Sequence, residues 1–253
     1  MTDDQRVAFV SGAARGIGLA IAETFLAEGY RVAIGDKDFA EATASAGRLD
    51  PSGERVLALD LDVSERASVD AAIAATADRF GGLDALINVA GTINPEPSES
   101  ISDESWSALL GVHLDGTYRC CRAAYPMLIR SGAPAIVSIS SIAATVGIPK
   151  RASYSAAKGA IESLTRVLAV EWADAGIRVN AVAPGYTMTK RMEGTIASGL
   201  LDESQVTRLI PMRRFARPEE IAHAVHFLSS ERSSYVTGQT LYVDGGTTVN
   251  SHW

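Results

Sequence analysis

Tyr154 and Lys158 are an acid–base pair of side chains four positions apart. The apolar pattern of residues 151–173 predicts a helix, and positions i and i+4 share one helix face. A tyrosine has a reference pKa of about 10, too high for an efficient base near neutral pH. An ammonium about 4 Å away, at an effective dielectric near 20, favours the phenolate by roughly 4 kcal/mol, or about three pKa units, and burial opposes it. The pair predicts a general acid/base; the alternative is an exposed pair without function.

A glycine-rich turn with Gly12, Gly16 and Gly18 follows the first expected strand and opens the first expected helix. Glycine lets the backbone turn tightly and approach a phosphate. A helix N-terminus adds free N–H groups and partial positive charge, which favour a pyrophosphate. The spacing differs from G-x-G-x-x-G, and an ordinary turn is the alternative. The strand–turn–helix context favours a dinucleotide site.

Asp36 ends the second expected strand, 18 residues after Gly18. A carboxylate there can accept hydrogen bonds from the adenosine ribose hydroxyls and repels a 2′-phosphate, so it favours NAD over NADP. Arg15 and Lys37 lie close by in the sequence, and either could neutralise such a phosphate. A turn-forming aspartate is the alternative reading of Asp36.

Short apolar runs alternate with longer helical patterns along the chain. Continuous apolar strands indicate burial on both faces and hence a parallel sheet covered by helices. The alternation predicts a doubly wound α/β sheet of about seven strands with helices on both faces. The expected strands are 6–10, 30–35, 55–60, 85–89, 135–140, 177–183 and 241–243, and the helices are 17–28, 39–49, 64–80, 103–130, 151–173 and 218–229. Residues 188–215 interrupt this rhythm, and we expect a mobile substrate lid there.

The composition is that of an ordinary globular protein, with 47% hydrophobic and 21% charged residues among 253. The net charge of −7 opposes nucleic-acid binding. No apolar run approaches the roughly 20 residues that cross a bilayer, and residues 1–5 do not resemble a secretory signal. The two cysteines, Cys120 and Cys121, are adjacent and cannot form a disulfide that links distant parts of the fold. We therefore expect a cytoplasmic protein without membrane or nucleic-acid partners and without a metal.

Taken together, the motifs resemble those of a classical short-chain dehydrogenase/reductase over nearly the whole chain. Any one of them is weak, but all occur in the order of that family. The motifs are the glycine turn, Asn88-Val89-Ala90-Gly91, Ser140-Ser141, Tyr154-Ser155-Ala156-Ala157-Lys158, Pro184-Gly185 and the tail Thr237-Gly238-Gln239-Thr240-Leu241-Tyr242-Val243-Asp244-Gly245-Gly246. The resemblance implies one Rossmann-type domain over residues 1–253 that binds NAD(P).

The resemblance also implies roles for individual residues. Tyr154 would be the general acid/base, Lys158 would also hold the nicotinamide ribose, and Ser141 would bind the substrate oxygen. Ser138 and Ser140 are alternatives for that serine. The implied cofactor contacts are Gly12, Arg15, Gly16, Ile17, Gly18, Asp36, Asp62, Val63, Asn88, Ala90, Gly91, Tyr154, Lys158, Pro184, Gly185, Thr187 and Thr189.

One position departs from the family pattern. Relatives carry an asparagine between the positions of Trp106 and Gly116, where this chain has His113. The family's asparagine kinks the helix and holds a water that links the lysine to solvent. His113 could hold that water, relay a proton itself with a pKa near 6.5, block the relay, or simply pack.

The resulting expectation is an NAD-dependent enzyme that interconverts a secondary alcohol, of polyol, sugar-alcohol or hydroxy-acid type, and a ketone. One alternative is a dinucleotide-binding regulator with negligible catalysis, motivated by His113. Another is a 3-oxoacyl, enoyl or imine reductase, although the four-residue Tyr–Lys spacing favours carbonyl chemistry because enoyl relatives space the pair more widely. The resemblance further implies a homotetramer, for which light scattering would give the mass.

Overall fold

The central strands are short, buried apolar runs. The structure, a computed structural model, describes residues 6–250; the first five residues, with the expectation about a secretory signal, lie outside this range. β1 (Val7–Ser11), β4 (Ala85–Asn88) and β5 (Ala135–Ile139) are buried at every position. Such strands require cover on both faces. The other strands are β2 (Arg31–Asp36), β3 (Val56–Asp60), β6 (Arg178–Pro184) and β7 (Thr240–Val243).

All seven strands pair in parallel in the order β3-β2-β1-β4-β5-β6-β7. From β1 the chain moves outward to β3 and then returns to place β4 on the other side of β1. This reversal creates a crevice beyond the carboxyl ends of the central strands, where doubly wound sheets bind ligands. The predicted Rossmann-like sheet is confirmed.

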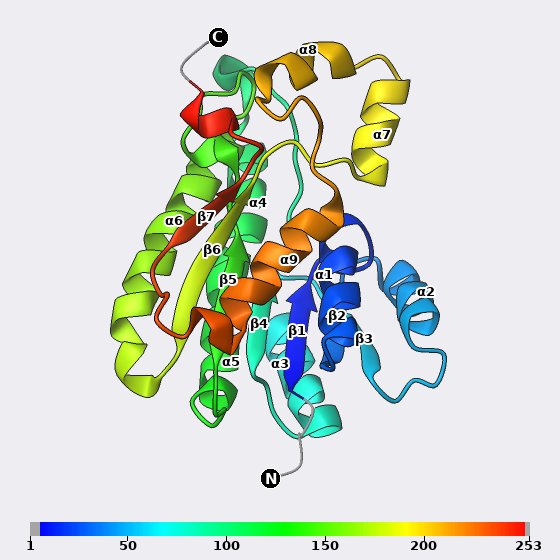
Figure 1. Cartoon of the computed structure of the whole chain (residues 1–253), viewed down its shortest axis with the longest axis vertical. Coiled ribbons are helices and arrows are strands. Elements are labelled where there is room, and N and C mark those ends of the chain that lie inside the picture. Colours follow the sequence, from blue (N-terminus) through cyan, green and yellow to red (C-terminus); the bar gives the residue numbers. More distant parts are fainter. Residues whose placement is uncertain (1–5, 251–253) are drawn as a thin grey trace.

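Helices cover both faces of the sheet and give it two apolar cores (Figure 1). One core joins the sheet to α1 (Gly16–Ala27) and α9 (Pro218–Ser229), which also pack on each other. The other joins it to α3 (Arg66–Phe80), α5 (Gly116–Leu128) and α6 (Ala152–Glu171). α2 (Phe39–Leu49) packs on the β2–β3 edge. No helix among residues 6–250 is long and apolar enough to cross a membrane.

The segment expected as one helix over residues 103–130 is interrupted. α4 (Asp103–Leu110) continues into a π-helical turn, Gly111–Asp115, before α5 begins. The wider turn lets the backbone N–H of Gly116 reach the carbonyl of Gly111, five residues back. Such turns shift the register of a helix and often occur at functional sites. Here the turn contains His113.

Residues 188–215, expected to form a mobile substrate lid, contain two short helices. These are α7 (Lys190–Ala197) and α8 (Glu203–Leu209), and both lie beyond the carboxyl ends of the strands (Figure 1). Val206, Ile210 and Phe215 form a small apolar cluster of their own beneath them. The segment is therefore held together locally, apart from the two main cores.

Candidate active site

A cavity of about 1230 Å³ lies at the carboxyl ends of the strands. Sites for drug-sized ligands occupy roughly 300–1,000 Å³, so this one has room for a dinucleotide and a small substrate together. The residues predicted for the site line it: Gly12, Arg15, Gly16, Ile17, Gly18, Asp36, Asp62, Val63, Ala90, Gly91, His113, Ser141, Tyr154, Lys158, Pro184, Gly185, Thr187 and Thr189. Asn88 alone among the predicted residues is absent from the lining.

The glycine turn is shaped so that side chains cannot fill it. Gly12 has a φ of +66°, and a Cβ there would lie 2.6 Å from the Cα of Ala90. A Cβ on Gly18 would lie 2.1 Å from the carbonyl oxygen of Gly12. α1 begins at Gly16 with no side-chain cap from Arg15 and no acidic residue in its first turn. The positive helix end is therefore open to the cavity, which fits a diphosphate.

Asp36 is fixed at the β2 side of the cavity. Its Oδ2 accepts a hydrogen bond from the Ala14 N–H and its Oδ1 one from the Asp38 N–H, both at 3.0 Å. The two cations that could neutralise a 2′-phosphate are both engaged with other carboxylates. Arg15 forms an ion pair with Asp38, and Lys37 forms one with Asp62 at 2.6 Å.

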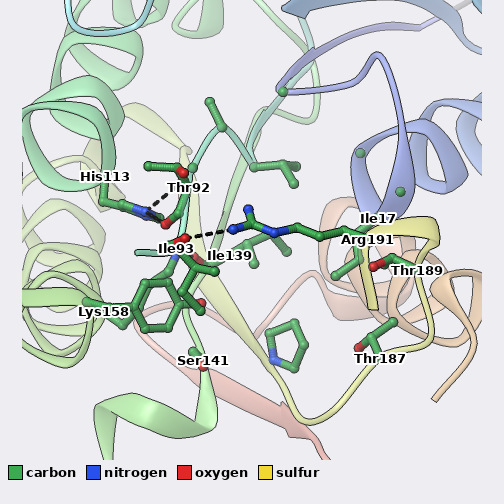
Figure 2. Close-up of a pocket in the computed structure, with 18 of the residues that line it drawn as sticks. Ile17, Thr92, Ile93, His113, Ile139, Ser141, Lys158, Thr187, Thr189 and Arg191 are labelled. Carbon is green, nitrogen blue, oxygen red and sulfur yellow. Dashed lines mark hydrogen bonds between the residues drawn. The ribbon is translucent and has the colours of Figure 1, made fainter. Parts of the chain in front are cut away.

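Tyr154 and Lys158 enter the cavity from α6, and Ser141 from the end of β5. The Lys158 Nζ lies 5.5 Å from the centre of the Tyr154 ring and donates a hydrogen bond to the Ile139 carbonyl at 2.6 Å. Figure 2 shows Ser141, Lys158 and His113 on one side of the cavity, with Ile17, Thr187 and Thr189 on the other. One wall thus holds the acid–base groups, and the opposite wall joins the glycine turn.

The acidity of Tyr154 differs from the sequence prediction. Burial raises the pKa of the phenol, and a hydrogen bond with Ser141 and the charges of Arg151 and Arg191 oppose this rise. Lys158 is not among the groups that lower it. Burial also lowers the pKa of the Lys158 ammonium to about 7. The prediction assigned Lys158 a full charge close to the phenol oxygen. The lysine instead points to a backbone carbonyl and is only partly charged near neutral pH.

We predict that Lys158 makes the stability of the protein depend on pH. Its pKa is about 7 in the folded chain against an ordinary 10.5, so between these values the unfolded chain binds more protons. The free energy of unfolding should therefore rise with pH from 7 towards 10, by at most about 1.4 kcal/mol per unit. Urea unfolding of the wild type and Lys158→Met at pH 7, 8 and 9 measures this. Parallel pH dependences of the two proteins would contradict it.

His113 is buried behind the catalytic face and held by the loop after β4. Its Nε2 lies 3.1 Å from the Thr92 N and 2.6 Å from the Thr92 carbonyl oxygen, and its ring packs edge-on against Tyr154. Burial, and then the charge of Lys158, lower its pKa to about 3. This lowered pKa disfavours the protonated imidazole that a proton relay would form, and His113 is neutral at physiological pH. Its Nδ1 is buried without a partner among the described residues, so a water-holding role is still compatible with the structure.

The hydroxyls of the two alternative serines have other side-chain partners, although Ser140 also lines the cavity. The Ser140 hydroxyl donates to the Glu162 carboxylate at 2.8 Å, and the Ser138 hydroxyl accepts from the Asn88 amide at 3.2 Å. Asn88 also reaches the Cys121 sulfur at 3.4 Å. It thus ties the ends of β4 and β5 to α5 from behind the cavity wall. Of the three serines, Ser141 is the one whose side chain hydrogen-bonds Tyr154.

The opposite wall combines a close backbone approach with two threonines. A Cβ on Gly185 would lie 2.7 Å from the Asp244 Cα, so only glycine fits at this crossing. Thr187 is buried and its hydroxyl donates to the Gly185 carbonyl at 3.2 Å. Thr189 caps α7 and lies close to Gly16. These residues place α7 directly over the glycine turn.

Sequence reasoning underestimated two arginines. Arg151, which precedes Tyr154 by three residues, and Arg191, in the first turn of α7, both line the cavity, whereas Lys150 does not. From the sequence alone, the charges of residues 188–215 are expected to form a solvated face, with recognition of an anionic or strongly polar substrate as the alternative. The spacing of Arg151 from Tyr154, one helical turn, was the available signal. Nothing in the sequence placed Arg191 opposite the loop after β4.

Comparison with known proteins identifies the family. Residues 12–248 match the family described as enoyl-(acyl carrier protein) reductase. The chain is 37% identical over 250 residues to D-threitol dehydrogenase of Mycolicibacterium smegmatis, covering 97% of this chain and 94% of that protein. It is 41% identical over 249 residues to cis-4-hydroxycyclohexanecarboxylate dehydrogenase of Sinomonas cyclohexanicum, covering 97% of each. The solved structure of ElxO with NADP bound superposes with a TM-score of 0.91 at 31% identity, covering 97% of this chain and all of that one.

The chain belongs to the short-chain dehydrogenase/reductase family. Members of this family are oxidoreductases that act on alcohols and carbonyls with a nicotinamide dinucleotide, and the relatives found here include both dehydrogenases and reductases.

Proposed function

We propose that this protein is an NAD-dependent oxidoreductase that interconverts a secondary alcohol and a ketone. The observation that carries the proposal is the meeting of Ser141, Tyr154 and Lys158 with an open glycine turn in one cavity. A hydroxyl, a phenol and an ammonium suit proton transfer to and from an alcohol oxygen. The named substrates of two relatives, a polyol and a hydroxy acid, are secondary alcohols.

The preference for NAD is supported by charge. The fixed carboxylate of Asp36 would accept the ribose hydroxyls and repel a 2′-phosphate. Arg15 and Lys37 each already pair with a carboxylate, so binding that phosphate would require breaking an ion pair. The relative that binds NADP shares the fold, and the distinction therefore depends on these side chains.

Each residue of the site has a separate role in the proposed reaction. A bound nicotinamide supplies the hydride acceptor for oxidation and the donor for reduction. Ser141 Oγ hydrogen-bonds the substrate oxygen, and Tyr154 Oη takes the hydroxyl proton in oxidation or returns it in reduction. Lys158 would hold the ribose, and the charges of Arg151 and Arg191 favour the phenolate. Neutral His113 packs behind Tyr154 and fixes its ring.

The test is a panel of secondary alcohols, polyols and hydroxy acids with NAD and NADP in parallel, followed by the absorbance of the reduced cofactor. We expect oxidation with NAD and weaker or no oxidation with NADP. Faster reaction with NADP would contradict the role of Asp36. Products from enoyl thioesters are analysed as well, because the matching family description names an enoyl reductase. A saturated acyl product without any alcohol–ketone turnover would replace the proposal.

A further inference from the structure

Arg151 presents an unsatisfied cation beside the proposed acid/base. It lines the cavity immediately before α6, and its Nη1 is buried without a hydrogen-bond partner among residues 6–250. Burial of a charged group without a partner is costly. No carboxylate of the described residues forms an ion pair with it. The site is therefore incomplete until an acceptor joins it.

Arg191 brings a second guanidinium to the same side of the cavity. Its side chain reaches across from α7, and its Nη2 donates to the Ile93 carbonyl at 2.7 Å (Figure 2). This hydrogen bond uses one of its five N–H donors, and Arg191 also lacks a carboxylate partner among the described residues. The charges of Arg151 and Arg191 repel each other, and both act on Tyr154.

The acidic residues of the cavity cannot neutralise these arginines. The lining carboxylates are Asp36, Asp38 and Asp62, which lie at or just after the ends of β2 and β3. Arg151 and Tyr154 lie beyond β5, on the other side of β1 and β4 in the sheet order. Each of the three carboxylates is already engaged by a cation or by backbone N–H groups. Two uncompensated guanidinium groups thus remain at the substrate end.

We propose that Arg151 and Arg191 together bind an oxyanion group of the substrate, which would make the substrate a secondary alcohol or ketone that also carries a carboxylate or a similar acid group. This inference rests on the proposed alcohol–ketone chemistry. A guanidinium binds a carboxylate through two parallel hydrogen bonds, which fixes orientation as well as charge. The anion would hold the substrate so that its reacting oxygen meets Tyr154 and Ser141.

The experiment compares linear 2-, 3-, 4- and 5-oxo acids with their methyl esters, using NADH. The ester keeps the ketone and removes the charge, so the ratio of kcat/KM for acid over ester isolates recognition of the anion. We expect a ratio of roughly ten or more for at least one chain length, since hydrogen bonds between charged groups are among the strong ones. 2-Oxopropanesulfonate and 2-oxopropylphosphonate, run beside the acids, show which acid group fits best.

Variants assign the preference to the two arginines. Arg151→Gln and Arg191→Gln should each lower the acid-to-ester ratio about tenfold, and Arg151→Lys should retain part of it. The control is Lys150→Gln, which removes the neighbouring positive charge outside the cavity lining and should leave the ratio unchanged. A change in the acidity of Tyr154 would affect the oxo acid and its ester equally, because Tyr154 protonates both, and it therefore cancels in the ratio. If Arg191→Gln weakens NADH binding without changing the ratio, Arg191 serves the cofactor and its part of the proposal is wrong.

The remaining outcomes separate this inference from the proposed function. Tyr154-dependent reduction of ketones without any preference for acids would overturn the inference and leave the function standing. If no ketone is reduced, the function fails, and calorimetric titration of the protein with the oxo acids decides the inference. Binding that is lost in Arg151→Gln supports it, and no binding overturns it.

Discussion

Tyr154→Phe should lower kcat by a factor of about 10²–10⁴ while leaving the affinity for NADH within a few-fold of the wild type. The substitution removes only the phenol oxygen, and the ring can keep its edge-on packing against His113. Proton transfer to the substrate oxygen then falls to water. Steady-state rates with the best alcohol of the panel measure the loss, and NADH titration measures the affinity.

The matched control for this variant is Tyr118→Phe. Tyr118 is an exposed tyrosine on α5, outside the cavity lining, so its loss should not change turnover. Full activity of Tyr154→Phe would rule out the phenol as acid/base. A folded Tyr154→Phe protein that no longer binds NADH would instead mean that Tyr154 holds the cofactor.

Asp36→Asn should lower the ratio of kcat/KM for NAD over NADP by roughly a hundredfold. The amide loses the charge that attracts the ribose hydroxyls and repels a 2′-phosphate, and hydrogen bonds to charged groups contribute about 1.5–3 kcal/mol. The amide keeps one acceptor for the backbone N–H groups that now bind the carboxylate. Parallel kinetics with the two cofactors give the ratio.

The control for the Asp36 variant removes a carboxylate elsewhere. Asp70 is half-exposed on α3, forms an ion pair with Arg66 and does not line the cavity. Asp70→Asn should keep the wild-type cofactor ratio. An unchanged ratio in Asp36→Asn would show that cofactor choice depends on other residues, of which Arg15 and Lys37 are nearest.

The sheet was predictable from the sequence because its strands are continuous apolar runs and its turns carry glycine. The helix over residues 103–130 was expected as one element, since its apolar pattern does not reveal the π-helical turn. Within that turn His113 is buried and contacts Thr92 in the loop after β4, a tertiary contact that periodicity does not show. For residues 188–215 the sequence predicted a lid but no helices, yet a local cluster around Val206 and Phe215 supports two helices. Short helices stabilised by such clusters leave little periodic signal.

The sequence predicted which residues line the site better than it predicted their protonation states. Spacing within motifs identified Tyr154 and Lys158, but the pKa of each depends on burial, which motif spacing does not show. The sequence predicted a lowered pKa for Tyr154, but burial raises it. Burial also lowers the pKa of His113 to about 3. Arg191 joins the cavity only because α7 folds back over it, a long-range contact that no local pattern predicts.

The central claim is that hydride passes directly between a nicotinamide held by this cavity and the carbinol carbon of the substrate. The most direct test is single turnover of a ketone with NADH deuterated on one or the other C4 face, followed by mass spectrometry of the product. The account predicts an alcohol with one deuterium on the carbinol carbon, transferred from one face only. An unlabelled alcohol, label lost to water, or deuterium on a saturated carbon–carbon bond would contradict it.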